Sequence, residues 1–257
     1  MREVRSAEGG EAAWERMTFG QWLENAWYHY KWHILITLFF TLFIGVCVMQ
    51  TCQKASYDVY ILYGGGEEIV RTSDNGTEPP YEQMKHALLP YVGDADGDGE
   101  VTLSYQTLYL LTNEQIHAIN EARRAEAALT GEAYEEVNAA YVKENLTVLN
   151  SELRYGDYYI CILSEQMYRT HRTTSDGVSL FAPLSSYVTD PAVQLVAEDA
   201  VLLSSTELGR TGPFADLPDG TVICLRTLSE FSARRSRARA QFAASEAVLR
   251  RMLAPHS

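Results

Sequence analysis

Hydrophobic and polar residues follow two different patterns along this chain. Positions 32–53 form an uncharged stretch of 22 residues between Lys31 and Lys54, and its centre is almost wholly apolar. After it, short apolar runs alternate with polar segments in which hydrophobic residues recur at helical spacing. The first pattern predicts one long apolar helix, and the second predicts a separate folded domain.

The uncharged stretch is long enough to cross a membrane. At about 1.5 Å per residue, a helix of this length reaches ~33 Å, and the hydrocarbon core of a bilayer is ~30 Å thick. A core helix of a soluble domain rarely stays uncharged for so long. Aromatic side chains with a lysine precede the stretch and suit a membrane interface; they are Trp22, Trp27, Tyr28, Tyr30, Lys31 and Trp32. We therefore expect a single transmembrane helix at 32–53 in the lipid bilayer.

A cleaved secretory signal is the competing interpretation of this stretch. The charged leader of such a signal is short, whereas 31 residues precede the stretch here. Cys52 lacks the small preceding residue that a lipoprotein cysteine usually needs, so we expect an uncleaved, unlipidated anchor. Within 16 residues of the stretch, Arg16 and Lys31 lie on its N-terminal side and Lys54 alone on the other. This bias favours a cytoplasmic leader at 1–31 and a domain at 54–257 outside the cell membrane.

Most of the acidic residues belong to the predicted domain. The formal net charge is −13, and residues 1–53 carry four basic and five acidic side chains, which leaves −12 for residues 54–257. This balance argues against nucleic acid as a partner, because phosphate contacts need clustered basic residues and a positive field. No GxSxG, HExxH or CxxC motif occurs in the sequence. We therefore expect a domain that binds or contacts something and is not an enzyme.

The pattern within the domain predicts strands that alternate with helices. Strands are expected at 57–63, 101–107, 158–163, 200–203 and 221–225, and helices at 81–89, 113–129, 132–153, 165–169 and from Ser229 onward. The third strand is apolar throughout, which is typical of a central strand covered on both faces. The alternation predicts an α/β fold with a mainly parallel sheet.

Two cysteines fall within predicted strands. Cys161 and Cys224 are both flanked by isoleucine and leucine. The favoured interpretation is a pair of buried thiols that act as small hydrophobic side chains, and a disulfide between them is the alternative.

The order of these features resembles uncharacterised single-pass membrane proteins of clostridia and their relatives. The resemblance covers most of residues 20–252 and is carried by the aromatic segment and anchor, by DADGDGEVTL at 94–103, and by LPDGTVICLR at 217–226. A second resemblance covers 149–188, where LNSELRYGDYYICILSEQMY and LFAPLSSYV are similar to extracellular solute-binding proteins of the second periplasmic-binding class. It implies a periplasmic-binding-like fold in one lobe or a reduced form, because about 200 residues are short for two lobes.

The segment after residue 93 matches the first half of an EF-hand calcium loop. Three carboxylates alternate along it, and a glycine after the third permits the sharp turn that wraps oxygen ligands around Ca²⁺. The candidate metal ligands are Asp94, Asp96, Asp98, Glu100 through its carbonyl, and Thr102 through a water. Tyr105 stands where an EF-hand has its bidentate glutamate, and calcium loops of solute-binding proteins borrow a distant carboxylate in such cases. An acidic, solvated turn is the alternative.

Two further segments are weaker candidates for binding. Gly64, Gly65 and Gly66 follow the first strand, and Ser164 and Glu165 follow the third, at strand ends where parallel sheets bind ligands, although an ordinary turn is the favoured interpretation. Arg234, Arg235, Arg237 and Arg239 form a basic run on the terminal helix, opposite a face with Phe231, Ala238, Phe242, Leu249 and Met252. Such a run usually pairs with acids elsewhere; a protein partner or an anionic membrane surface is the alternative.

These expectations combine into a membrane-anchored, extracytoplasmic binding or sensing module that is stabilised by calcium and binds an unknown small ligand. The alternative is a structural or assembly factor whose domain surface and Trp-rich leader contact a membrane protein partner. A cavity of about 300 Å³ or more at the strand ends near Gly64 and Ser164 would favour a ligand, and a flat face would favour a protein.

Overall fold

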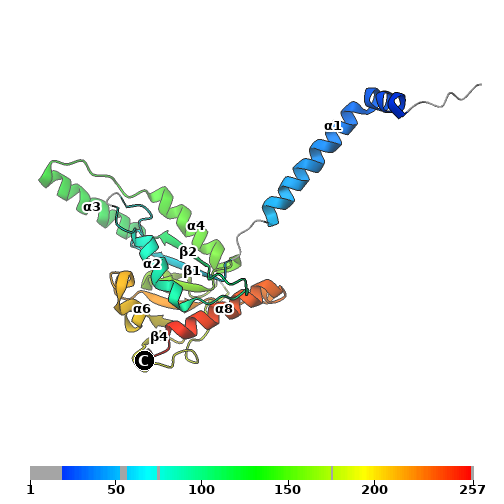
Figure 1. Cartoon of the computed structure of the whole chain (residues 1–257). Coiled ribbons are helices and arrows are strands. Elements are labelled where there is room, and N and C mark those ends of the chain that lie inside the picture. Colours follow the sequence, from blue (N-terminus) through cyan, green and yellow to red (C-terminus); the bar gives the residue numbers. More distant parts are fainter. Residues whose placement is uncertain (1–18, 53–56, 74–75, 175, 256–257) are drawn as a thin grey trace, which may run out of the picture. The chain divides into compact units, whose positions relative to one another are not determined.

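The computed structural model describes residues 19–52, 57–73, 76–174 and 176–255 (Figure 1). The chain divides into two units, Met1–Ser56 and Tyr57–Ser257, and each is considered by itself. Most of the predicted leader, residues 1–18, lies outside the described residues.

The first unit contains one long helix, α1 (Phe19–Cys52). Its segment Tyr30–Met49 is long and apolar enough to cross a membrane, a test that a signal sequence near the N-terminus also passes. The helix starts before the predicted boundary at residue 32, because the aromatic segment contains no proline or glycine after Gly20 that would end a helix.

The second unit is built around a six-stranded sheet in the order β2-β1-β3-β6-β5-β4. The strands are β1 (Val59–Gly65), β2 (Leu103–Tyr109), β3 (Ile160–Leu163), β4 (Leu195–Ala197), β5 (Ala200–Leu202) and β6 (Val222–Leu225). β1 runs parallel to β2 and β3, whereas the pairs β3–β6, β6–β5 and β5–β4 are antiparallel. The domain is therefore mixed α/β.

The prediction of a mainly parallel sheet is wrong for half of the strands. A parallel pair needs a long crossover, and helices supply it between β1, β2 and β3. Only Glu198 and Asp199 separate β4 from β5, so the chain reverses there as a hairpin. β4 itself was not predicted, since its short sequence lies at the exposed edge of the sheet and shows no clear alternation.

The predicted helices of the domain are present in the predicted order with two differences in their bounds, and several short helical turns between them were not predicted. They are α2 (Pro80–Leu88), η1 (Leu89–Tyr91), α3 (Asn113–Thr130), α4 (Ala139–Tyr155), α5 (Glu165–His171), η2 (Leu203–Ser205), α6 (Glu207–Arg210), η3 (Gly212–Phe214), α7 (Glu230–Ala233) and α8 (Ser236–Met252). The terminal helix is broken at Arg235, whose extended backbone begins α8. The helix predicted at 132–153 begins only at Ala139; the preceding segment has no regular secondary structure, and Arg123 and Arg124 bind it at Glu135 and Glu136.

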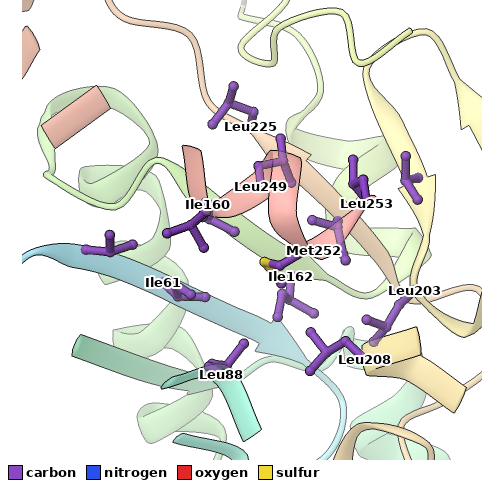
Figure 2. Packing of buried hydrophobic residues seen from close by; sticks show 14 of the residues in the cluster. Ile61, Leu88, Ile160, Ile162, Leu203, Leu208, Leu225, Leu249, Met252 and Leu253 are labelled. Atoms are coloured by element: carbon purple, nitrogen blue, oxygen red, sulfur yellow. The ribbon is translucent and has the colours of Figure 1, made fainter. Parts of the chain in front are cut away.

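The sheet has an apolar core on each face. Ile61 and Tyr63 of β1 point to one face, where they join residues of α2 and α8, and Leu62 points to the other, where it joins residues of α4 and α5. Figure 2 shows the first core, with side chains of α8 lying against those of β1 and β3. β3 is buried on both faces, as its apolar sequence predicted.

Cys161 and Cys224 are buried thiols in neighbouring strands, as predicted. They stand directly opposite each other in the antiparallel pair β3–β6, and both are free. Burial raises the pKa of the Cys161 thiol to about 12 and that of Cys224 well above its ordinary value.

Candidate functional site

The acidic loop at 94–102 is held by a buried aspartate from another part of the chain. Asp58 stands immediately before β1 and is only 4% exposed. Its Oδ1 accepts hydrogen bonds from the backbone N–H of Ala95 at 2.6 Å and of Asp96 at 3.3 Å. Its Oδ2 accepts from the N–H and the hydroxyl of Thr102, at 2.7 and 3.0 Å. Asp58 therefore joins both ends of the loop to the start of the sheet.

These hydrogen bonds decide the charge of Asp58. Burial alone would raise the pKa of this carboxyl group, but the donors of Thr102, Ala95 and Asp96 hold the pKa below its ordinary value. The group is thus an anion at neutral pH.

The loop itself folds around its own carboxylates. Asp94 accepts hydrogen bonds from the N–H groups of Gly97 at 2.6 Å and Gly99 at 3.0 Å. Both glycines have positive φ, 79° and 90°, a conformation in which other residues are strained. Gly99 therefore provides the sharp turn that the calcium-loop pattern requires of this position.

Three carboxylates converge where the loop meets the sheet. Asp58, Asp94 and Asp96 each place an oxygen so that the three atoms lie within 4.8 Å of one another, and the group could hold a metal ion. Asp94 and Asp96 are exposed, so an ion could reach them from solvent. A carboxylate has about four lone-pair positions, and Asp94 uses two of them for the loop. The chemistry of such an all-oxygen set suits a hard divalent cation.

The other predicted ligands lie differently. Asp98 is not part of the triad, and its carboxylate accepts from the N–H of Glu100 at 2.8 Å. The side chain of Thr102 is bound to Asp58. Tyr105 lies inside β2 and is buried, with its hydroxyl 3.4 Å from the sulfur of Met84, so it takes no part in the loop.

Sequence reasoning did not identify Asp58 as a member of this group. The residue is separated from Asp94 by 36 positions, and local spacing carries no information on such a contact. One signal was present, because Asp58 is the only charged residue in the strand sequence YDVYILY, and a charge at the start of a buried strand needs partners.

The carboxyl ends of β1 and β3 lie together but are filled. The N–H of Ser164 donates to the carbonyl of Gly64 at 2.9 Å, so these two predicted residues are neighbours. A Cβ atom at Gly64 would lie 3.1 Å from side-chain carbons of Leu110 and Leu163. The oxygen of Ser164 caps α5, and Glu165 pairs with Arg169 at 2.5 Å. Leucines thus occupy the space beside Gly64.

Hollows on the domain surface lie at other places. One of about 320 Å³ lies between α3 and residues 132–135, and one of about 250 Å³ adjoins it beside Tyr109, Arg123 and Asn138. A third, of about 410 Å³, lies between residues 93–95 and the alanine-rich face of α8. The second includes Tyr109, the last residue of β2, in its lining.

A second buried aspartate lies in the hairpin between β4 and β5. Asp199 is 3% exposed and accepts hydrogen bonds from the Tyr168 hydroxyl at 2.6 Å, from Nε of Arg172 at 3.0 Å and from the Ser179 hydroxyl at 3.1 Å. Burial opposes ionisation, but these three donors hold the pKa of Asp199 below its ordinary value. The carboxylate of Asp199 is therefore already bound by side chains of the domain itself.

Comparison of the chain with family models, with curated proteins and with solved structures finds no match in any of the three.

Proposed function

We propose that the chain is a membrane-anchored, extracytoplasmic binding or sensing module that is non-catalytic and stabilised by calcium. The observation that carries this proposal is the combination in one chain of a helix able to span a membrane with a separate domain whose acidic loop gathers three carboxylates. In this reading α1 is an uncleaved anchor, the leader is cytoplasmic and the domain lies outside the cell.

The acidic triad supports calcium as the bound ion. Calcium prefers six to eight oxygen ligands in flexible geometry, and carboxylates with backbone carbonyls and water supply them. Asp58 provides the distant carboxylate that the loop needs in place of Tyr105. The four hydrogen bonds that Asp58 accepts fill its lone-pair positions, so a bound ion would compete with these donors. We therefore expect the weak range of extracellular modules, with Kd about 10⁻⁴ to 10⁻³ M.

We also propose that the domain binds a small ligand, as solute-binding proteins do, but not at the strand ends near Gly64 and Ser164. The space beside Gly64 is taken by leucines, so a small ligand would occupy the hollow lined by Tyr109, Arg123 and Asn138. The two buried cysteines are not candidates for a nucleophile, because a thiol with a raised pKa and no exposure reacts poorly.

A structural or assembly role is the second candidate, and α3 favours it. None of its 18 residues is buried, and Leu129 is 89% exposed near its end. A helix without buried side chains offers a surface on which a partner protein can pack. Loss of a membrane complex on replacement of exposed α3 residues, with calcium binding unchanged, would favour this role over ligand binding.

The topology experiment tests the proposal in whole cells. Alkaline carbonate should fail to extract the full-length protein, and external protease should digest residues 54–257 while sparing the leader. Release into the carbonate supernatant would contradict the anchor. Protection of the acidic domain in intact cells, with digestion after lysis, would contradict the extracytoplasmic location.

A further inference from the structure

The junction between α7 and α8 presents a cluster of cations around one exposed aromatic ring. We call Phe231, Arg234, Arg235, Arg237 and Arg239 the arginine corner. All five side chains are exposed, and Phe231 is 73% exposed. The sequence placed Phe231 on the apolar face of one continuous helix; this was wrong, because α7 is a separate turn that is capped by Ser229 and Arg234.

The arginines of this corner do not pair with acids. Among the ion pairs of the described residues, which require a nitrogen and an oxygen within 4.0 Å, none involves the four side chains. Arg235 lies over the Phe231 ring at 5.5 Å, and Arg239 donates to the carbonyl of Ala233 at 2.7 Å. The expectation that the run is neutralised by acids elsewhere is therefore wrong. The guanidinium groups keep donors available for an anion.

Their position is unfavourable for the folded domain alone. Arg235 is the N-cap of α8 and provides no side-chain cap, and the first turn of this helix contains no acid. Cations near a helix N-terminus meet the positive end of the macrodipole, which is an unfavourable arrangement. Stability of the domain does not explain the cluster, whereas an external anion would offset that cost.

The corner lies at the end of the sheet where β1, the first strand after α1, begins. β3 also begins at this end of the sheet, and β6 ends there, with Ile160 opposite Leu225. α7 begins five residues after the end of β6. Two more exposed aromatic residues precede strands that begin at this end of the sheet. Tyr57 precedes β1, and Tyr155, the last residue of α4, precedes β3. The domain starts at Tyr57, five residues after the end of α1.

We propose that the arginine corner binds the anionic headgroups of the lipid bilayer that α1 spans. The inference rests on the anchoring part of the proposed function. Guanidinium groups bind phosphate with several donors, and an exposed aromatic ring is suited to a headgroup region. The connection between α1 and the start of β1 is short, so the bilayer has a high effective concentration for the domain. A site of low intrinsic affinity is then sufficient for binding. A cluster of cations in a domain of net charge −12 marks one surface on which an anionic membrane is attracted.

The negative charge of the acidic loop affects the proposed contact between the arginine corner and lipid. Asp94 and Ala95 line the same hollow as Ala240 and Ala244 of α8, so the triad lies beside the helix that begins at the corner. Its negative charge weakens attraction to anionic lipid, and a bound divalent cation would reduce that effect. The lipid measurement is therefore made both in chelator and with calcium, and the arginine dependence is expected in both.

Hydrogen exchange of the full-length chain in lipid nanodiscs tests the proposal. Nanodiscs of phosphatidylcholine alone are compared with nanodiscs that also contain phosphatidylglycerol. We expect amides at 230–240 to exchange at least about fivefold more slowly in the anionic discs, the factor that one arginine near such a surface contributes. High salt should remove the difference.

Matched variants separate the corner from net charge. Gln replaces Arg234, Arg235, Arg237 and Arg239 in one variant, and Arg71, Lys143, Arg154 and Arg169, all exposed, in the control. The first variant should lose the lipid difference and the control should keep it. Equal exchange of the wild type in both lipids, or slowing that persists in the first variant, would overturn the proposal; an acidic protein surface would then fit the corner better. Recovery of the chain with both kinds of nanodisc reports the anchor separately.

Discussion

The domain contains two buried aspartates that are equally hidden and chemically different. Asp58 is bound mainly by backbone N–H groups of a loop, and its neighbours Asp94 and Asp96 are also acids. Asp199 is bound by the side chains of Tyr168, Arg172 and Ser179, and one of these is a cation. Asp199 thus has its counter-charge inside the protein, whereas the charge around Asp58 is uncompensated by any ion pair of the described residues.

The difference separates a structural role from a binding role. A carboxylate with its own cation stabilises the fold and has little to gain from a metal. A carboxylate that is fixed by neutral donors beside two more acids carries a negative charge that a cation would neutralise. The comparison predicts that both aspartates stabilise the domain and that only Asp58 affects the response to calcium.

Replacement of Asp199 should have the largest effect on stability. Asp199→Ala leaves the Tyr168 hydroxyl buried without its acceptor and breaks the pair with Arg172, which is 43% exposed and so can be solvated in part. We expect a loss of about 3 kcal/mol of unfolding free energy, the lower end for a buried pair. Denaturant unfolding measures it, and Glu198→Ala on the same hairpin is the exposed control. A loss under about 1 kcal/mol would show that the network is not a stabilising one.

Asp58→Asn should cost somewhat less. The variant keeps the shape but places an amide donor opposite the N–H groups of the loop or of Thr102. We expect a loss of about 2 kcal/mol, since a buried acceptor is removed. Asp157→Asn is the control, because Asp157 also precedes a strand but is exposed. An unchanged unfolding midpoint in Asp58→Asn would mean that the loop is not held by this carboxylate.

Acid unfolding provides a second check on both aspartates. Their pKa values in the folded protein are below the ordinary value, so their stabilisation is present above the unfolded pKa of about 3.9 and is lost as pH falls through the folded value. Stability should therefore decline below about pH 4, and each variant should show a smaller decline. A decline of the same size in the variants and the wild type would contradict these pKa directions.

The cysteine pair should contribute through packing alone. Cys161→Ala and Cys224→Ala each remove a fully buried sulfur from the sheet, which should cost about 1 to 2 kcal/mol. Reductant should leave the melting temperature of the wild type unchanged, because both thiols are free. A large fall in melting temperature on addition of reductant would show that the two residues form a disulfide.

Elements whose signal is local could be predicted from the sequence. The run at 158–163 is apolar enough to require burial on both faces, and α3 begins at a capping box formed by Thr112 and Gln115 and ends at Gly131 in the left-handed conformation. The segment 132–138 has a helix-favouring composition, but it has no regular secondary structure and is bound by Arg123 and Arg124 of α3. Tertiary contacts override propensity there.

The candidate site was predictable only in part, for a similar reason. The acids and glycines of the loop are local, and their pattern indicated a metal before any contact was known. The choice among the acids depends on Asp58, whose bonds to the loop and to Thr102 span 37 to 44 positions. The space at Gly64 likewise depends on Leu110 and Leu163, which come from other strands and their ends.

Thermal unfolding of the full-length protein in chelator, calcium and magnesium tests the central claim most directly. At roughly millimolar calcium and the expected Kd, mass action gives about 0.4 to 1.4 kcal/mol, or a rise of very roughly 1 to 5 °C in Tm, with less for magnesium. Asp94→Asn should remove the rise, and Asp216→Asn, an exposed acid elsewhere, should keep it. Asp98→Ala tests which acids bind the ion. A full EF-hand pattern predicts that this variant loses the calcium-dependent rise in Tm, and the triad predicts that it keeps the rise. Identical curves for the wild type in all three solutions would contradict the account and leave the loop an acidic turn.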